Sequence, residues 1–301
     1  MNVLSVFDGI SGGQMALERA GVKVSNYYAS EINVPDMVAV SKMYPDTKML
    51  GDICSIDDVM LDKIGNINLF IGGSPCQSFS RSGDGSGFDG KSKLFWEYVR
   101  LLNAIKKRNP NVKFLLENVV MKKEWEQIIT DALGVEPILI DSKLVSAQKR
   151  QRLYWTNIEG VQQPEDRKVT IVDIVSNEGE FVEVGDLMWF EEGEYRVKNA
   201  TKKGYLPVVD WDTINLDFPN SKTRRGRVAK QKCNTLNTSC NYGIFIKGNV
   251  KKITPKECAR LQTIPDDKIE IMLDCMTDSQ IRFACGNGWT VDVIAHIFSY
   301  L

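Results

Sequence analysis

The sequence has a single histidine, His296, and its seven cysteines are scattered without a Cys-x-x-Cys pair. Zinc sites are commonly built from closely spaced cysteine and histidine pairs, so this pattern argues against a zinc site. The odd number and irregular spacing of the cysteines also argue against a disulfide framework. We therefore expect no metal centre and no disulfide, and we interpret His296 as a structural residue.

The chain also lacks a long apolar run and an excess of charge of either sign. No stretch approaches the roughly 20 apolar residues that span a bilayer, and the start has no basic segment of the targeting type. We expect a soluble, cytoplasmic protein. The formal net charge of −1 gives no overall attraction to nucleic acid, so any DNA contact depends on local basic clusters.

The most informative stretch surrounds Cys76. An apolar run over residues 68–71 ends at two glycines and Pro75, and Cys76 follows directly. Proline restricts both itself and Ser74, so we expect the thiol on a stiff turn at the edge of a sheet. Residues 78–91 are polar and contain four glycines, as expected of a loop that closes over a site. Most free cysteines are buried bystanders, but this setting makes Cys76 a candidate nucleophile.

Four motifs follow one another along the chain. They are Phe7-Asp8-Gly9-Ile10-Ser11-Gly12-Gly13, Pro75-Cys76-Gln77, Glu117-Asn118-Val119 and Gln148-Lys149-Arg150-Gln151-Arg152. In this order they resemble the motifs of the DNA (cytosine-5) methyltransferase family. The resemblance extends over nearly the whole chain, except for about residues 176–222, where we recognise no motif.

Strand-like runs alternate with helix-like segments in the first half of the chain, which predicts an α/β, doubly wound sheet. The resemblance implies the Rossmann-like sheet of S-adenosylmethionine-dependent methyltransferases. The alternation fails from about residue 161, where short strand-like pieces begin, so we expect a second, smaller, mostly β domain. The predicted division is a catalytic, cofactor-binding domain over residues 1–165 plus 252–301 and a target-recognition domain that reads DNA over residues 166–251.

The glycine turn near the start predicts a site for a nucleotide-bearing cofactor. Backbone amides of the turn and the ring of Phe7 offer contacts, and Glu31, after the second strand, is placed for ribose hydroxyls. A dinucleotide suits the same pattern, whereas the resemblance implies S-adenosyl-L-methionine, with S-adenosyl-L-homocysteine as product. The implied cofactor-binding residues are Phe7, Asp8, Gly9, Ser11, Gly12, Glu31, Ile32, Asp52, Ile53, Pro75, Asn287 and Trp289.

Cytosine C5 is a poor nucleophile, and the resemblance implies that the thiolate of Cys76 first adds to C6. Glu117 is then the acid that hydrogen bonds to N3, which requires a raised pKa in a dry site. Asn118 and Arg150 hold the base and the carboxyl, and Arg152 orients neighbouring groups. The chemistry needs no metal, but the cytosine has to be flipped out of the duplex.

The densest basic segment covers residues 223–232, within the small domain. A basic run is more often only a solvated face, but beside a base-modifying site its natural role is contact with phosphates. The predicted DNA-binding residues are Gln77, Ser80, Ser82, Arg224, Arg225, Arg227 and Lys230. We expect a monomer that acts on double-stranded DNA, and a cognate restriction endonuclease is a further partner that the resemblance allows.

Three other functions stay open on the sequence. A nicotinamide or flavin oxidoreductase explains the glycine turn but neither the Gln148 to Arg152 motif nor the basic segment. A non-catalytic DNA-binding protein leaves the intact Cys76 and Glu117 without a purpose. A tRNA cytosine-5 methyltransferase of the same superfamily fits nearly all motifs. We rank it below a DNA enzyme because Cys-Phe-Thr often replaces Cys-Gln-Ser in that group.

Overall fold

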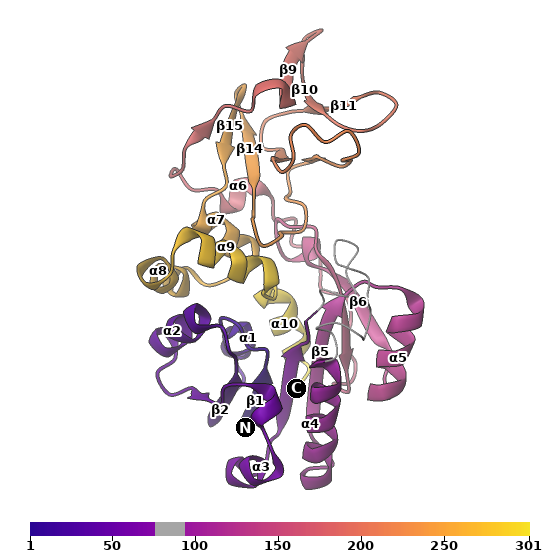
Figure 1. Ribbon diagram of the computed structural model, residues 1–301, viewed down its shortest axis with the longest axis vertical. Coiled ribbons are helices and arrows are strands. Elements are labelled where there is room, and N and C mark those ends of the chain that lie inside the picture. The colour runs from indigo at the N-terminus through magenta and orange to yellow at the C-terminus, as the bar shows by residue number, and fades with distance from the viewer. Residues whose placement is uncertain (76–93) are drawn as a thin grey trace. The chain divides into compact units, whose positions relative to one another are not determined.

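A computed structural model describes residues 1–75 and 94–301. These residues form two compact units, which are described separately below (Figure 1). The first unit contains residues 1–141, 151–164 and 291–301, and the second contains residues 142–150 and 165–290.

The described part of the first unit is built on a seven-stranded sheet with the strand order β3-β2-β1-β4-β5-β7-β6. The strands are β1 (Asn2–Val6), β2 (Asn26–Ser30), β3 (Lys48–Met49), β4 (Leu69–Gly73), β5 (Lys113–Val119), β6 (Pro137–Asp141) and β7 (Gln151–Thr156). Neighbours from β3 to β5 are parallel, whereas β7 is antiparallel to both β5 and β6. The predicted doubly wound α/β sheet is thus confirmed, and its winding reverses between β1 and β4, where such sheets bind ligands.

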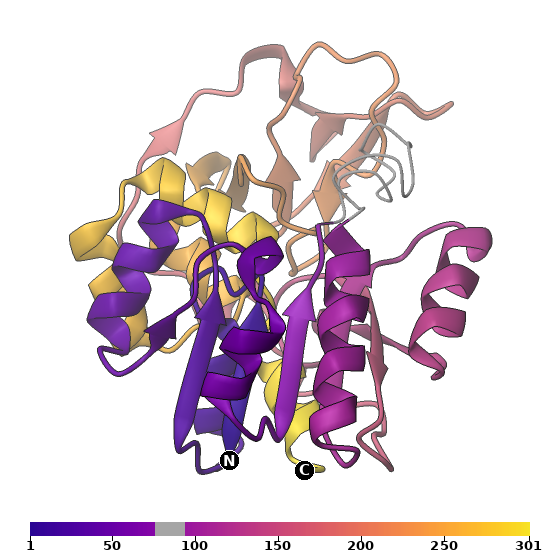
Figure 2. The same ribbon diagram turned by 60° about the horizontal axis from the view of Figure 1, so that its bottom comes forward.

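Helices cover both faces of this sheet. They are α1 (Gly12–Arg19), α2 (Val34–Met43), α3 (Asp58–Ile64), α4 (Leu94–Arg108), α5 (Lys123–Leu133) and α10 (Val291–Phe298), with a 3₁₀ turn, η1 (Ile53–Ser55). Right-handed crossovers leave β1 and β4 in opposite directions, which puts α1 and α4 on opposite faces. Figure 2 shows α4 in front of the strands and α10 behind them. The core under α3, α4 and α5 contains a stacked pair, Phe70 and Tyr98, with ring centroids 4.5 Å apart.

The helix α10 returns the chain to its beginning. It packs against α1, and both helices bury apolar side chains, Met15 and Leu17 on α1 and Ile294 and Ile297 on α10. Arg19, at the end of α1, pairs with Asp292. Two segments separated by most of the sequence therefore complete one face of the sheet.

The described residues of the second unit form two antiparallel sheets, with the orders β11-β10-β9 and β13-β12-β14-β15-β8. The elements are η4 (Ser142–Leu144), α6 (Ile171–Ile174), β8 (Phe181–Val182), η5 (Gly185–Leu187), β9 (Met188–Glu191), β10 (Glu194–Lys198), β11 (Tyr205–Val208), β12 (Thr213–Asn215), β13 (Val228–Ala229), β14 (Tyr242–Ile246), β15 (Asn249–Lys252), α7 (Pro255–Leu261), α8 (Asp266–Cys275) and α9 (Asp278–Asn287). Val197, Ile214 and Phe245 lie at the centre of their shared core. The smaller, mostly β part that the sequence predicts is confirmed.

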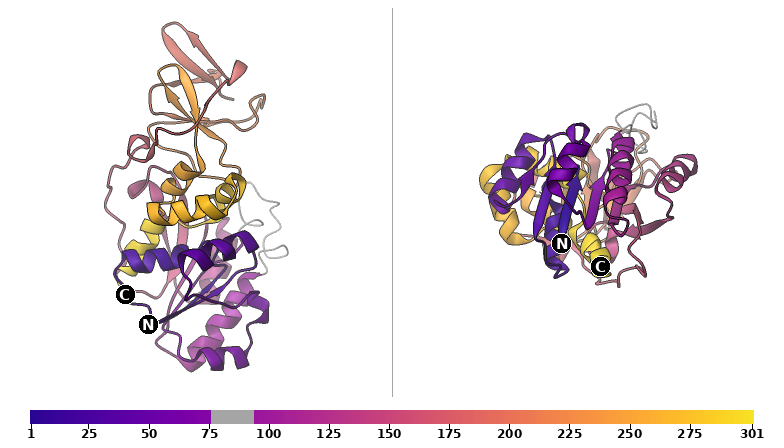
Figure 3. Two further views of the ribbon diagram at one scale, coloured as in Figure 1. Left: turned by 90° about the vertical axis from the view of Figure 1, so that its left-hand side faces the viewer. Right: turned by 90° about the horizontal axis from the view of Figure 1, so that it is seen from below.

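Strand β15 leads directly into α7, as the left view of Figure 3 shows. A capping box with Pro255 at the first turn begins the helix, as its sequence indicates: Thr254 accepts from Glu257 N, and Glu257 accepts from Thr254 N. Glu257 also pairs with Lys251 of β15. Residues 252–290 consequently pack with the small sheets, although the sequence assigned them to the catalytic domain. The functional division at residues 165 and 252 stays a prediction.

The expectation that the chain has no disulfide is wrong. Cys240, ahead of β14, and Cys258, on α7, form a disulfide across a sequence separation of 18 residues. Cysteine spacing does not reveal this pair, because the two residues meet only after the hairpin of β14 and β15 has folded back. The other described cysteines, Cys54, Cys233, Cys275 and Cys285, are not part of a disulfide.

No helix within residues 1–75 and 94–301 is long and apolar enough to cross a membrane. The same two ranges contain no group of three or more histidine, cysteine, aspartate or glutamate side chains arranged to hold a metal ion.

Candidate active site

The glycine turn between β1 and α1 has an unusual backbone. Phe7, Gly9 and Ser11 have φ angles of 56°, 55° and 59°, in the left-handed region that side chains other than glycine seldom adopt. Ser11 precedes α1 without capping it, and its hydroxyl donates to Asp8 instead. The space that a Cβ on Gly9 would enter is open. Strained backbone of this kind concentrates at ligand sites, and this turn exposes its main chain to an open space.

Glu31, directly after β2, is bound to the same turn. Its carboxylate accepts from Gly9 N at 2.7 Å, and from Ile32 N and Asn33 N at 2.8 Å each. The neighbouring side chain of Ile32 is 70% exposed. The structure thus brings together the turn, Glu31 and Ile32, which the sequence predicts to share one cofactor site.

Two further acids lie close to Glu31. Asp8 accepts from the Tyr27 hydroxyl at 2.8 Å, and burial raises the pKa of its carboxyl. Asp36, on the first turn of α2, is 5% exposed, and its Oδ1 has no hydrogen-bond partner among the described residues. Burial, followed by the negative charges of Glu31 and Asp8, raises the pKa of Asp36 to about 7.

Sequence analysis missed Asp36. An acid in the first turn of a helix ordinarily complements the helix dipole and lies in solvent. The only available signal was its position shortly after Glu31, within the apolar helix sequence Val-Pro-Asp-Met-Val.

The two predicted cofactor residues after β3, Asp52 and Ile53, are divided between surface and core. Asp52 is exposed and caps η1, since Oδ1 accepts from Cys54 N at 2.9 Å. Ile53 is 4% exposed and packs with Ile56 and Leu61. The side chain of Ile53 therefore belongs to the core, and a cofactor contact through its backbone stays a prediction.

Strands β4 and β5 end side by side. Gly73 pairs with Glu117 in the parallel register. The next residue, Ser74, is held by Asn118, because Asn118 Nδ2 donates to Ser74 Oγ at 3.0 Å and to Ser74 O at 3.2 Å. A Cβ on Gly72 would lie 2.8 Å from Val6 Cγ2, so glycine is required where β4 passes β1. The turn that leads to Pro75 and Cys76 thus starts beside Glu117.

Glu117 is buried and has an arginine partner. Arg152 Nε lies 2.9 Å from Glu117 Oε1, and both side chains are 11–12% exposed. Arg152 comes from β7, the strand antiparallel to β5, where it faces Val119. Arg152 therefore lies beside Glu117, and the orienting role that the sequence suggests for it stays a prediction.

Several predicted residues lie outside the described ranges. These are Cys76, Gln77, Ser80, Ser82 and the loop predicted over residues 78–91. Their roles stay predictions.

The Gln148 to Arg152 motif is shared between the units, because Gln148 and Arg150 belong to the second one. Arg150 is 3% exposed and donates to the carbonyl oxygens of Leu236, Gly286 and Gly288 at 2.9–3.3 Å. Gln148 accepts from Leu236 N and donates to Leu261 O. Arg150 therefore fixes the end of α9, whereas Gln148 joins Leu236 to the end of α7. A contact between Arg150 and a base stays a prediction.

The end of α9 carries two predicted cofactor residues, Asn287, which is exposed, and Trp289, which is half-buried. A Cβ on Gly286 would lie 2.6 Å from the backbone of Asn237, so the helix passes that loop in direct main-chain contact. The predicted roles of Asn287 and Trp289 are not tested by this geometry.

The four basic residues predicted to bind DNA differ in exposure. Arg225 and Lys230 are exposed, Arg224 is half-buried, and Arg227 is only 1% exposed. Arg227 donates to the carbonyl oxygens of Asn215, Asp217 and Phe218, so its guanidinium is unavailable to a phosphate. The prediction for Arg227 is corrected accordingly, because a count of charges in the sequence does not show which of them folds inward.

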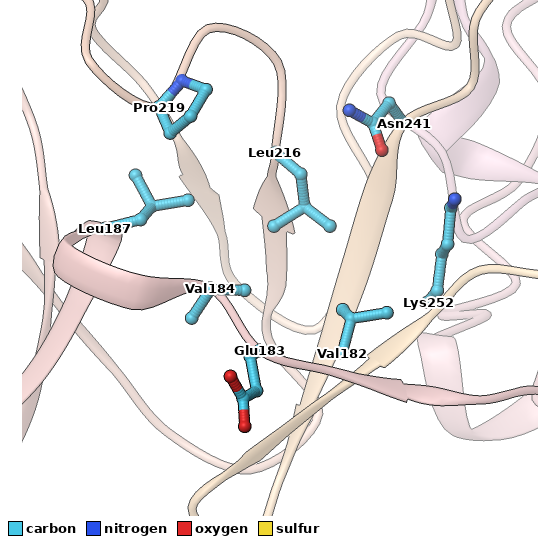
Figure 4. Close-up of a pocket in the computed structure, with 8 residues that line it drawn as sticks. All are labelled: Val182, Glu183, Val184, Leu187, Leu216, Pro219, Asn241 and Lys252. Atoms are coloured by element: carbon cyan, nitrogen blue, oxygen red, sulfur yellow. The ribbon is translucent and has the colours of Figure 1, made fainter.

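A pocket of about 230 Å³ lies in the second unit, beside β8 and β12 (Figure 4). Its lining is mostly apolar and consists of Val182, Glu183, Val184, Leu187, Leu216, Pro219, Asn241 and Lys252. The lining includes none of the residues that the sequence predicts for catalysis, cofactor or DNA.

Comparisons with known proteins extend over the whole chain. The family model of the C-5 cytosine-specific DNA methylases matches residues 1–301. The type II methyltransferase M.DsaV of Dactylococcopsis salina is 26% identical over 99% of this chain and 84% of its own. The type II methyltransferase M1.ScrFI of Lactococcus lactis subsp. cremoris is 27% identical over 97% of this chain and 75% of its own.

Solved structures share the fold. The methyltransferase EhMeth of Entamoeba histolytica superposes with a TM-score of 0.71 at 18% identity, over 100% of this chain and 97% of that one. The Dnmt2 methyltransferase of S. pombe gives a TM-score of 0.63 at 17% identity, over 99% and 97% of the two chains.

Proposed function

Because the chain belongs to the C-5 cytosine-specific DNA methylases and is a DNA (cytosine-5-)-methyltransferase, we propose that it methylates C5 of a cytosine that is flipped out of a specific duplex sequence. The observation that carries this proposal is the juxtaposition of β4 and β5. Gly73 lies beside Glu117, and Asn118 holds Ser74, two residues before Cys76. The segment that leads to Cys76 and the strand that contains Glu117 thus end side by side at the carboxyl ends of β4 and β5. This arrangement supports a nucleophile and an acid that act on one base.

The residues around the glycine turn fit S-adenosyl-L-methionine, which supplies the methyl group on a positively charged sulfur. Asp8, Glu31 and Asp36 bring three carboxyl groups together there, and the buried Oδ1 of Asp36 lacks a partner among the described residues. A cation is favoured by this environment, whereas the pyrophosphate of a dinucleotide would add negative charge to it. This contrast favours the methyltransferase over the oxidoreductase that the turn alone allowed.

In the proposed reaction, the Cys76 thiolate adds to C6, and the π electron pair of the C5–C6 double bond shifts toward C5 and the ring. Glu117, oriented by Arg152, hydrogen bonds to N3 and supports that charge. C5 then takes the methyl group, and breakage of the methyl–sulfur bond would leave S-adenosyl-L-homocysteine. Loss of the C5 proton returns the electron pair to the C5–C6 bond and expels the thiolate, so Cys76 is regenerated.

The first experiment measures tritiated methyl incorporation by wild type and by Cys76→Ser. Unmethylated chromosomal DNA and transfer RNA serve as alternative substrates. We expect transfer to DNA by the wild type and only background transfer by Cys76→Ser, because a serine hydroxyl without a base is a far weaker nucleophile. Cys54→Ser, at an exposed free cysteine, is the matched control and keeps wild-type activity. Cys258 is unsuitable as a control because it is part of the disulfide.

DNA that contains 5-fluorocytosine in place of cytosine tests the covalent step separately. Fluorine at C5 leaves no proton to remove, so the thiolate stays attached and the protein–DNA adduct survives denaturation. Activity of Cys76→Ser near that of the wild type, or transfer to RNA alone, would reject the proposal. Sequencing the methylated cytosines identifies the recognised sequence.

A further inference from the structure

Phe218, in the loop after β12, is the most exposed of the large apolar side chains that the structure describes, at 73%. Its φ angle is 49°, in the left-handed region that a bulky side chain seldom occupies. A single exposed apolar residue needs no explanation by itself, but an exposed aromatic ring on strained backbone indicates a conformation that other contacts enforce.

Those contacts come from Arg227. Its Nη1 donates to Asn215 O at 3.2 Å and Asp217 O at 2.9 Å, and its Nη2 donates to Phe218 O at 2.6 Å. Arg227 is only 1% exposed, and its Nε has no hydrogen-bond partner among the described residues. A buried cation on three carbonyl groups is itself unfavourable for folding. The buried arginine and the strained residue both lower the stability of the fold, and the loop keeps this conformation despite them.

Further contacts hold the loop, both within its own segment and from Asn237. Asp217 accepts from Asn237 Nδ2 at 2.9 Å, and Ser221 N donates to Phe218 O at 2.9 Å. Arg224 lies over the Phe218 ring, with Cζ 5.6 Å from the centroid, and its guanidinium is 3.5 Å from Asp217. The ring is therefore presented on a rigid support, with positive charge beside it.

The surroundings of Phe218 are basic. Lys222 and Arg225 are exposed in the same segment, and Arg225 Nε donates to Ala200 O, which directs its stem along the surface. Phe190 differs, since it is 61% exposed on β9 but is followed by Glu191, Glu192 and, across the turn, Glu194. In contrast to Phe190, the exposed ring of Phe218 lies beside positive charge that attracts phosphates.

We propose that Phe218 is an apolar wedge that stacks between bases of duplex DNA while Arg224 and Arg225 contact the adjacent phosphates. Apolar side chains used in this way unstack one base step and kink the duplex. The inference rests on the proposed function, because it takes duplex DNA as the ligand. It adds a residue that positions the substrate and that no sequence motif indicated.

The test uses the full chain and a short duplex with a donor dye and an acceptor dye at its two ends. Binding is followed by anisotropy across a salt series. We expect Phe218→Ala to weaken binding by roughly 5- to 150-fold, the effect of losing one stacked base. Its dependence on salt should match that of the wild type, because the ring displaces no counterions. Energy transfer between the dyes should rise with the wild type and not with Phe218→Ala.

Phe218→Trp should restore both readouts, and Phe190→Ala should bind like the wild type. Thermal denaturation of each variant identifies any loss of folding. Equal affinity of Phe218→Ala and Phe190→Ala, or a changed salt dependence in Phe218→Ala, overturns the wedge.

Methyl transfer to DNA by a Phe218→Ala variant with unaltered binding rejects the wedge and leaves the proposed function intact. Wild type that binds and kinks DNA through Phe218 but transfers no methyl group supports the wedge and rejects the proposed function.

Discussion

Asp36 shows how strongly one residue can depend on its surroundings. Its carboxyl has an ordinary pKa of 3.8 and a folded-state pKa of about 7. Below the lower value the group is neutral in both states and does not affect stability. Between the two values only the unfolded chain loses the proton, so the folded state loses stability as the pH rises. Above about pH 7 the loss is complete.

We therefore expect Asp36→Asn to stabilise the cofactor-free protein at pH 8 by about 2–4 kcal/mol and to change little at pH 4. Urea denaturation at pH 4, 6 and 8 measures the difference. Asp46→Asn, at an exposed carboxylate on the loop after α2, is the control and should have no effect at any of these pH values. A constant difference between Asp36→Asn and wild type across this range would contradict the prediction.

At the scale of elements, α7 is held by a buried ion pair. Glu257 is fully buried and accepts from Lys251, from Ser176 N at 2.8 Å and from Thr254 N at 2.8 Å. Its carboxylate thus caps α7 and at the same time joins the helix to β15 and to the segment after α6. Lys251, 4% exposed, depends on it for compensation of charge.

Glu257→Ala should lower the free energy of unfolding by about 3–5 kcal/mol, because it leaves Lys251 buried and unpaired. Gln280→Ala removes the equivalent side chain from the capping box of α9, where no ion pair is involved, and should cost about 1 kcal/mol or less. Thermal denaturation compares the two. The double variant Lys251→Met/Glu257→Leu removes both charges and should recover much of the loss. Equal destabilisation by Glu257→Ala and Gln280→Ala would show that the pair contributes little.

At the scale of the whole molecule, the chain has no net positive charge, so DNA binding depends on a few cations. Replacing Arg224 and Arg225 together by alanine should weaken binding to every duplex and lower the slope of log affinity against log salt by about 1–2. Lys106→Ala/Lys107→Ala, at the end of α4 and at the sheet edge opposite the predicted site, is the control pair. Identical slopes for both double variants and wild type would rule out phosphate contacts by these arginines.

Most of the first unit could be predicted from the sequence. Apolar runs bounded by glycine and proline marked β1, β4 and β5, and parallel winding then required Glu117 to lie near the end of β4. The features that it did not predict depend on side chains that meet only when the chain is folded. The inward fold of Arg227, the burial of Asp36 and the disulfide of Cys240 all follow from tertiary contacts that no local pattern contains.

The packing of α10 against α1 has a consequence for synthesis. Arg19 and Asp292 are 273 residues apart, which at ordinary translation rates of 5–20 residues per second is roughly 14–55 s. During that interval Met15 and Leu17 of α1 lack the helix that covers them. The nascent chain therefore holds an unfinished sheet unit until α10 leaves the ribosome, and its uncovered apolar face is a binding surface for chaperones.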